Sequence, residues 1–177
     1  MAGVSAEAAE FRAPEPLASR HDLSRFVNGV HPGLDQWLRD RAHASEGLSA
    51  RTYVACPSHE PNRVAGYFCI SAAVEQRAAM PSAKLRRGLP EQVPLLLIGR
   101  LAVDAPWQGR GLGSALLVDA LRRCLAASGI AGVRGVVAHA IDEAAVGFYE
   151  RHGFKRSPLG ERVMLMPMET VRMLVGK

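Results

Sequence analysis

The segment Gln108-Gly109-Arg110-Gly111-Leu112-Gly113 has the residue types and spacing best suited to chemistry in this sequence. Its three alternate glycines remove the Cβ atoms that would keep a ligand away from the backbone. The residues from Ser114 onward have helical spacing, so the free N–H groups and the positive dipole end of that helix face the turn. The pattern predicts a binding turn for a diphosphate.

Two well-known phosphate-binding motifs do not describe this turn. A Walker A loop needs a Lys-Ser/Thr pair after its last glycine, and the dinucleotide fingerprint needs the spacing Gly-x-Gly-x-x-Gly. Neither occurs in this segment. A Gly-rich strand-to-helix turn without a ligand has the same composition, so the turn alone leaves both interpretations open.

The elements around the turn predict an α/β fold. The apolar stretch 95–103 predicts a strand directly before the turn, and residues 114–128 predict an amphipathic helix after it. A crossover through that helix makes part of the sheet parallel. The other predicted elements are a helix at 34–44, strands at 51–56 and 64–73 that form a hairpin, a basic loop at 74–92, a strand at 133–140, a helix at 142–152 and a strand at 163–168.

Length and composition predict one domain. The 177 residues are 48% hydrophobic and 22% charged, which suits a single core. Residues 1–16, rich in Ala and Glu, predict a flexible leader before a domain at 17–177.

The net charge of +5 favours a polyanionic partner. The three cysteines lack metal-ligand spacing and the longest apolar runs are shorter than the roughly 20 residues that span a bilayer. We therefore expect no metal, no membrane segment and a cytoplasmic protein.

Two segments beside the turn add a family resemblance. Leu101-Ala102-Val103-Asp104 precedes it, and the stretch Phe148-Tyr149-Glu150-Arg151-His152-Gly153-Phe154 follows it. Together with Gln108-x-x-Gly111-x-Gly113, they resemble the GNAT superfamily of N-acetyltransferases, whose fold is a mixed central sheet flanked by helices. A wider set of motifs between Pro16 and Leu174, including His21-Asp22-Leu23 and Arg51-Thr52-Tyr53-Val54, resembles the GNAT toxins of bacterial type II toxin–antitoxin systems.

The superfamily resemblance implies acetyl-CoA as the cosubstrate. It implies that backbone N–H groups near Val103 bind the pantetheine and polarise the thioester carbonyl, and that Tyr149 protonates the departing thiolate. Without the resemblance, a packed aromatic residue on a short helix is the favoured interpretation of Tyr149. Asp142 stands where many members have Asn, and we interpret it as a helix N-cap. The implied cofactor-binding residues are Leu101, Ala102, Val103, Gln108, Gly109, Arg110, Gly111, Leu112, Gly113, Ser114 and Phe148.

The toxin resemblance implies a substrate and partners. Such toxins acetylate the α-amine of aminoacyl-tRNA, halt translation, are held inactive by a ribbon-helix-helix antitoxin and are often homodimers. A GNAT enzyme for a small amine or a protein N-terminus, and a binding module without activity, are the alternatives. The basic residues that we expect near RNA are Arg100, Lys84, Arg86, Arg87 and Arg151.

The choice of amine also has a physical basis. No Glu or Asp stands out as a general base for a lysine amine, whose pKa is about 10.4, whereas an α-amine of pKa about 7.7–8.0 is substantially neutral already. This difference favours an α-amine, with bound water or His139 as the remaining proton acceptors.

Overall fold

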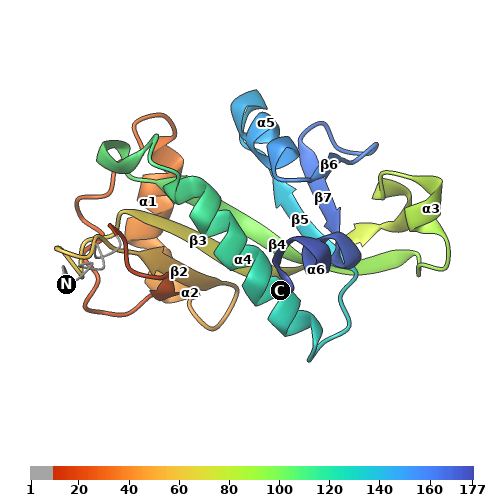
Figure 1. The fold of residues 1–177 in the computed structure, drawn as a ribbon, viewed down its shortest axis with the longest axis horizontal. Helices are drawn as coiled ribbons and strands as arrows, with labels where there is room; N and C mark the ends of the chain where they lie inside the picture. The colour runs from red at the N-terminus through yellow and green to blue at the C-terminus, as the bar shows by residue number, and fades with distance from the viewer. Residues whose placement is uncertain (1–9) are drawn as a thin grey trace, which may run out of the picture. The chain divides into compact units, whose positions relative to one another are not determined.

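The computed structural model describes residues 10–177, in which seven strands form one mixed sheet of order β1-β2-β3-β4-β5-β7-β6, flanked by helices (Figure 1). This architecture confirms the predicted fold class. The described chain divides into two compact units. Residues 10–68 and 101–116 form unit 1, and residues 69–100 and 117–177 form unit 2. β3, β4 and α4 contribute residues to both units.

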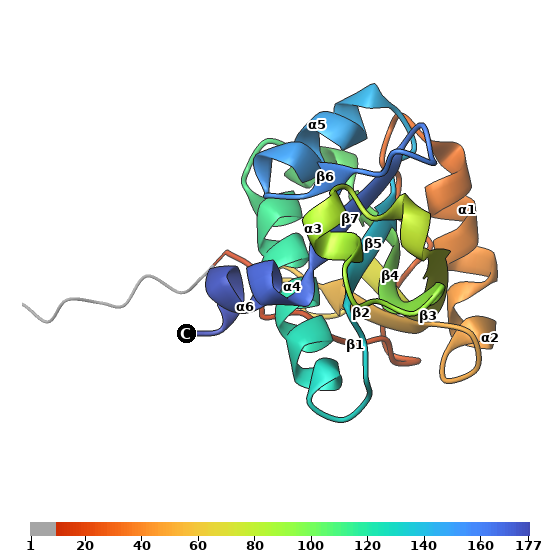
Figure 2. The same ribbon diagram turned by 90° about the vertical axis from the view of Figure 1, so that its right-hand side faces the viewer.

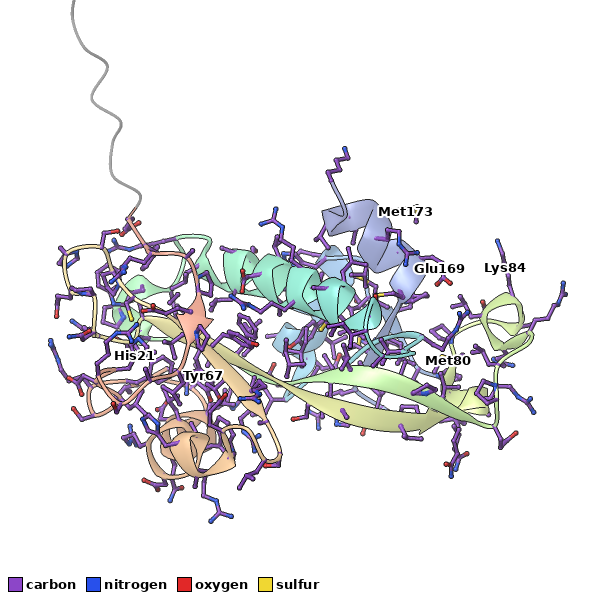
Figure 3. All side chains as sticks on the ribbon, turned by 90° about the horizontal axis from the view of Figure 1, so that it is seen from below. His21, Tyr67, Met80, Lys84, Glu169 and Met173 are labelled. Carbon is purple, nitrogen blue, oxygen red and sulfur yellow. The ribbon has the colours of Figure 1, made fainter. Side chains whose placement is uncertain are left out.

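Unit 1 is built around a small aromatic core. Its elements are β1 (Glu15–Pro16), α1 (Pro32–Asp40), α2 (Ala42–Ser45), β2 (Arg51–Ala55), the start of β3 (Gly66–Gln76), the end of β4 (Gln92–Val103), the short 3₁₀ helix η2 (Ala105–Trp107) and the start of α4 (Leu112–Ser128). The buried Tyr67, labelled in Figure 3, packs its ring on Phe26 and Trp37, and its hydroxyl donates to the Leu34 carbonyl at 2.8 Å. Trp37 is partly buried and anchors α1 to this core.

The N-terminal segment differs from the expected leader. Residues 10–16 pair with unit 1: β1 is antiparallel to β2, and the Arg12 N–H donates to the Cys56 carbonyl at 2.9 Å. The Phe11 ring meets Trp107 edge to face, with centroids 5.4 Å apart. The composition of this segment gave no indication of these contacts because backbone pairing needs no apolar run. Residues 1–9, the rest of the expected leader, lie outside the described residues.

Unit 2 contains the parallel part of the sheet (Figure 2). Its elements are the rest of β3, η1 (Arg77–Ala79), α3 (Ala83–Arg86), most of β4, the rest of α4, β5 (Gly135–His139), α5 (Glu143–Arg151), β6 (Lys155–Arg156), β7 (Val163–Pro167) and α6 (Met168–Val175). β4 and β5 are parallel, with Leu97 opposite Val137, and β5 and β7 are antiparallel. The predicted crossover through α4 is thereby confirmed.

Several elements differ from the sequence prediction. The predicted helix at 34–44 is two helices, because Arg41 leaves the helical backbone between α1 and α2. The predicted loop at 74–92 contains the end of β3, η1, α3 and the first residue of β4. α6 was not predicted. In the part of the chain that the structure describes, no helix has the length and apolar character that crossing a membrane requires.

Candidate active site

The Gly-rich turn of unit 1 has the backbone of an anion-binding site. Gly109 and Gly111 have φ values of 75° and 80°, which side-chain-bearing residues rarely adopt. Alternation of such residues with ordinary ones makes neighbouring N–H groups converge. A Cβ built on either glycine meets no atom within 4 Å, so the space above the turn is open. α4 begins at Leu112 and directs its first N–H groups to this space. The turn therefore fits a diphosphate.

Gln108 supports this turn from behind. Its Nε2 donates to the carbonyls of Asn28 at 2.7 Å and Val103 at 2.9 Å, and its backbone N–H donates to the Ala105 carbonyl at 3.3 Å. These hydrogen bonds occupy the side-chain amide and backbone N–H donors of Gln108, which a bound phosphate could otherwise accept from. In the structure Gln108 therefore fastens the turn to the end of β4, and the cofactor contact that the resemblance implies for this residue stays a prediction.

The side chain of Arg110 is also engaged within unit 1. Its guanidinium lies 2.6 Å from a carboxylate oxygen of Glu10 and 5.1 Å from the centroid of the Trp107 ring. What Arg110 offers a ligand in this arrangement is its backbone N–H at the centre of the turn. Trp107, packed between Arg110 and Phe11, shields the turn on this side.

The end of β4 is held by a buried carboxylate. Asp104 is 1% exposed; its Oδ1 accepts the Val27 N–H at 2.9 Å and its Oδ2 lies 3.3 Å from the Arg63 guanidinium. Its backbone N–H donates to the Ala65 carbonyl at 2.8 Å. These contacts fix the chain where β4 leaves the sheet and enters the turn, with Ala102 buried and Leu101 and Val103 partly exposed on either side.

The start of α4 packs closely on β3. A Cβ added to Gly66 would lie 2.7 Å from a methyl carbon of Leu116, 3.2 Å from a methyl carbon of Leu112 and 3.4 Å from the Ala102 carbonyl. Leu112 and Leu116 are buried. Glycine at position 66 therefore lets the helix that carries the turn approach the sheet.

Tyr149 lies in unit 2, on α5. Asp142 caps this helix by accepting the Ala145 N–H at 2.7 Å, which confirms the N-cap interpretation. Tyr149 is 7% exposed, and its ring packs edge to face on Phe148 and Phe154. Burial, assisted by the neighbouring Cys69, raises the pKa of the Tyr149 hydroxyl well above its ordinary value. The phenol thus keeps its proton throughout the physiological range.

Arg100 and Tyr149 share Cys69 as a neighbour, a residue that sequence reasoning missed. Burial raises the pKa of the Cys69 thiol, and the Arg100 guanidinium opposes that rise through its charge and a hydrogen bond. The same sulfur lies 3.2 Å from the position of a Cβ on Gly99. Within unit 2 the structure therefore groups the expected substrate arginine with the expected acid. A buried cysteine in a strand gives no such indication in the sequence.

His139, the expected alternative base, has a carboxylate beside it. Its Nε2 lies 3.6 Å from Oε1 of Glu75, and the two side chains are 56% and 26% exposed. Sequence reasoning did not single out Glu75, because it lies in the stretch predicted as a loop.

The other basic residues expected near RNA differ in exposure and in hydrogen bonding. Arg86 donates through Nε to the Met80 carbonyl at 3.1 Å, so its side chain is held on its own loop. Lys84, Arg87 and Arg151 are exposed. Lys84 and Arg86 belong to α3, whose N-cap is Ser82, and Arg151 ends α5.

A cluster of possible metal ligands in unit 1 is better explained by hydrogen bonding. Single ligand atoms of Glu15, His21 and Cys56 lie within 4.8 Å of one another. However, Nδ1 of His21 accepts the Ala18 N–H at 2.9 Å, so the imidazole proton is on Nε2 and is directed at Glu15, 3.1 Å away. A protonated Nε2 has no lone pair for a metal. Burial raises the pKa of Cys56 to about 11, which keeps its thiol neutral.

The strand, the Gly-rich turn on a helix N-terminus and the tyrosine on the helix after β5 are the elements that the resemblance to acyl-CoA-dependent N-acetyltransferases led us to expect. A model of the acetyltransferase (GNAT) domain family matches residues 49–156, and the chain belongs to this family. It is an acetyl-CoA-dependent N-acetyltransferase.

Within this family, the chain is similar to several toxins. The chain is 36% identical to a tRNA-acetylating toxin of Mycobacterium tuberculosis (strain ATCC 25618 / H37Rv), over 94% of this chain and 98% of that protein. A structure of AtaT complexed with acetyl-methionyl-tRNAfMet has a TM-score of 0.85 and 27% identity, covering 93% of this chain and 98% of that one. A mutant AtaT toxin bound to acetyl-CoA and the C-terminus of the antitoxin AtaR has a TM-score of 0.78 and 25% identity, covering 95% and 99%.

Proposed function

We propose that this enzyme transfers the acetyl group of acetyl-CoA to the α-amino group of aminoacyl-tRNA, and thereby blocks translation as the toxin of a type II toxin–antitoxin pair. The observation that carries the proposal is the 36% identity to a tRNA-acetylating toxin over 94% of this chain. The site geometry supports it, because the turn, the end of β4 and Tyr149 each have a structure suited to their part in acyl transfer.

The turn and β4 act as binding elements. Backbone N–H groups from Gly109 to Gly113 receive the diphosphate, while Gln108 and Asp104 hold that backbone in place. Backbone N–H groups near Val103 donate to the thioester carbonyl and stabilise the charge that develops on its oxygen. Ala102 and Leu112 contribute buried contacts beneath these groups, and Leu101, Ser114 and Phe148 complete the proposed cofactor contacts.

Tyr149 supplies one proton. As the amine nitrogen bonds to the acetyl carbon and the carbon–sulfur bond breaks, Tyr149 donates its hydroxyl proton to the departing sulfur and later regains a proton from solvent. Its raised pKa means that the hydroxyl carries this proton before the reaction. The proton lost by the amine passes to water or to His139, whose ring has Glu75 beside it.

The basic side chains form the proposed contact with tRNA. Arg100 lies beside Cys69, as does Tyr149, and we assign it to the acceptor end that carries the amino acid. Lys84, Arg87 and Arg151 are exposed and suit phosphates, and Arg86 follows Lys84 in α3. A cytoplasmic location, a homodimer and a ribbon-helix-helix antitoxin complete the proposal. AtaT binds the C-terminus of its antitoxin AtaR, which supports an antitoxin here.

The decisive experiment incubates purified enzyme with labelled acetyl-CoA and a pool of charged tRNA, followed by mass analysis of the released amino acids. We expect N-acetylated amino acids from the wild type and almost none from Tyr149→Phe. Acetylation of free amines or of protein N-termini, with the charged tRNA unmodified, would reject the tRNA substrate and establish the alternative enzyme. Intact acetyl-CoA binding without turnover on any amine would instead establish a binding module.

A further inference from the structure

Unit 1 has a hollow on one side of the Gly-rich turn to which the proposed reaction gives no role. Its volume is about 240 Å³, and its walls are residues 11–14, the end of β2 at Ala55, the stretch 110–112 and Ala115 on α4. Gly111, one of the two turn glycines with positive φ, is part of this wall. The hollow therefore opens directly beside the place proposed for the diphosphate.

The N-terminal segment forms one side of the hollow and is fixed there by several contacts. The Arg12 N–H donates to the Cys56 carbonyl at 2.9 Å, and the Phe11 ring packs edge to face on Trp107, with centroids 5.4 Å apart. β1 follows directly and pairs with β2. Residues 11–14 thus have a defined conformation beside the turn, although nothing in their composition predicts it.

The hollow carries positive charge that is only partly balanced. Arg12 and Arg110 both line it. The Arg110 guanidinium lies 2.6 Å from a carboxylate oxygen of Glu10, so its charge is balanced within the unit. Arg12 is exposed and has no ion pair within residues 10–177. One guanidinium is therefore available to an anion.

The rest of the lining is mostly apolar. It comes from Phe11, Ala13, Pro14, Leu112 and Ala115. Apolar walls with one arginine suit a group that combines a flat ring with a phosphate. Pockets that hold a whole drug-sized ligand have volumes of about 300–1,000 Å³, so this smaller hollow suits one end of a larger ligand.

Acetyl-CoA has an end with this chemistry. Its diphosphate separates the pantetheine, which carries the acetyl thioester, from an adenosine whose ribose bears a 3′-phosphate. When the diphosphate lies on the turn and the thioester lies near Val103 at the end of β4, the adenosine must leave the turn on another side. The hollow borders Gly111 and offers apolar walls to the purine and Arg12 to the phosphate.

We propose that residues 11–14 complete the acetyl-CoA site, and that Arg12 binds the 3′-phosphate of the adenosine in the hollow beside the turn. Arg12 then selects acetyl-CoA over its 3′-dephospho analogue. A guanidinium suits this role because it donates two parallel hydrogen bonds to one phosphate. The inference rests on the diphosphate-binding role proposed for the turn and needs no particular amine acceptor.

The test measures the dissociation constants of acetyl-CoA and of its 3′-dephospho analogue by calorimetry on the full chain. We expect the wild type to bind acetyl-CoA about tenfold more tightly than the analogue, because the analogue lacks one charge-assisted contact. Arg12→Ala should raise the dissociation constant of acetyl-CoA by about the same factor and leave that of the analogue unchanged. Because Arg12 is exposed, added salt should reduce the wild-type preference.

Arg25→Ala is the matched control. Arg25 is another arginine of unit 1, its side chain is 57% exposed, and it lies outside the lining of the hollow. Its variant loses the same charge and should bind both ligands like the wild type. Circular dichroism shows that each variant is folded.

The two ligands make the outcomes distinct. A wild type that binds both equally, or an Arg12→Ala variant that keeps the wild-type preference, would overturn the proposal. So would an equal loss of affinity for both ligands, because Arg12 would then act on the diphosphate or on the fold. The titrations contain no amine, and acetyl transfer to charged tRNA is measured separately, so failure of the tRNA proposal is distinguishable from failure of this site.

Discussion

Removal of the Asp104 carboxylate should lower the free energy of unfolding by more than removal of a surface carboxylate does, because Asp104 holds the chain at the start of the turn. The carboxylate is buried, accepts the Val27 N–H at 2.9 Å and lies 3.3 Å from Arg63, whose side chain is only 17% exposed. Arg63 also has a buried Nε without a hydrogen-bond partner among the described residues. The Arg63 guanidinium also lies 3.6 Å from a Glu60 carboxylate oxygen and 5.9 Å from the centroid of the Trp107 ring, and Asp104 is the buried one of its two carboxylate partners.

The magnitude follows from these two contacts. A hydrogen bond to a charged group contributes about 1.5–3 kcal/mol, and removing one partner of a fully buried ion pair costs about 3–5 kcal/mol in total. Because Arg63 retains some contact with water, we expect Asp104→Ala to lower the free energy of unfolding by about 3 kcal/mol. Asp104→Asn keeps an oxygen for the Val27 N–H and should cost about half as much, roughly 1.5 kcal/mol.

Urea unfolding, followed by fluorescence and circular dichroism, measures these differences. The matched control is Asp119→Ala, which removes the Asp119–Arg123 pair on α4, whose side chains are 23% and 32% exposed. Such surface pairs contribute about 0.2–1 kcal/mol. If Asp104→Ala cost no more than Asp119→Ala, the buried carboxylate would not be what holds the end of β4, and this account of the turn would be refuted.

Four further predictions concern the turn, the proposed acid Tyr149 and the N-terminal segment. Gly111→Ala should weaken acetyl-CoA binding, measured by calorimetry, because a φ of 80° strains alanine by about 1–2 kcal/mol; Gly33→Ala, with ordinary φ and equally open surroundings, should not. Tyr149→Phe should lower kcat by about 10²–10⁴-fold with acetyl-CoA affinity retained. Because the pKa of Tyr149 is raised above the ordinary tyrosine value of about 10, the wild-type rate should not decrease as the pH rises to about 10. A decrease at lower pH in the pH–rate profile would contradict the role of Tyr149 as the acid. The hydrogen bond from His21 lowers the pKa of Glu15 in the folded protein. The ionised carboxylate therefore stabilises the fold fully above the unfolded pKa of about 4.3, and this stabilisation is lost as the pH falls through the lower folded pKa. In acid titrations, the difference in free energy of unfolding between wild type and Glu15→Gln should disappear over that range.

The sequence predicts those parts of the fold that depend on local patterns. Alternate glycines specify the left-handed backbone at Gly109 and Gly111, and Asp142 caps α5 through a residue three positions along the chain. The parallel pairing of β4 and β5 follows from the strand–helix–strand order. Each of these features is decided by neighbours in the sequence, so residue type and spacing are enough to predict it.

The features that escape prediction depend on residues far apart in the chain. Gln108 reaches the Asn28 carbonyl across 80 positions, and Arg63 reaches Asp104 across 41. Either side chain, viewed in the sequence, is equally an exposed polar residue. The family motif implies a cofactor contact for Gln108, which stays a prediction, and it does not indicate that the amide of this residue also fastens the turn.

The same distinction between local motifs and long-range contacts bears on which side chains select the acceptor amine. In the proposed mechanism the turn receives a diphosphate that every acetyl-CoA enzyme must bind, so its geometry cannot distinguish one amine from another. The proposed role of Tyr149, protonation of the departing sulfur, is likewise common to all acceptors. Selectivity must therefore come from side chains near the reacting amine, and in unit 2 the structure offers Arg100 beside Cys69 and the His139–Glu75 pair. Cys69 and Glu75 carry no motif, and the sequence alone predicts no more than a diphosphate-binding turn; acetyl-CoA and the tRNA substrate are both reached only through resemblance.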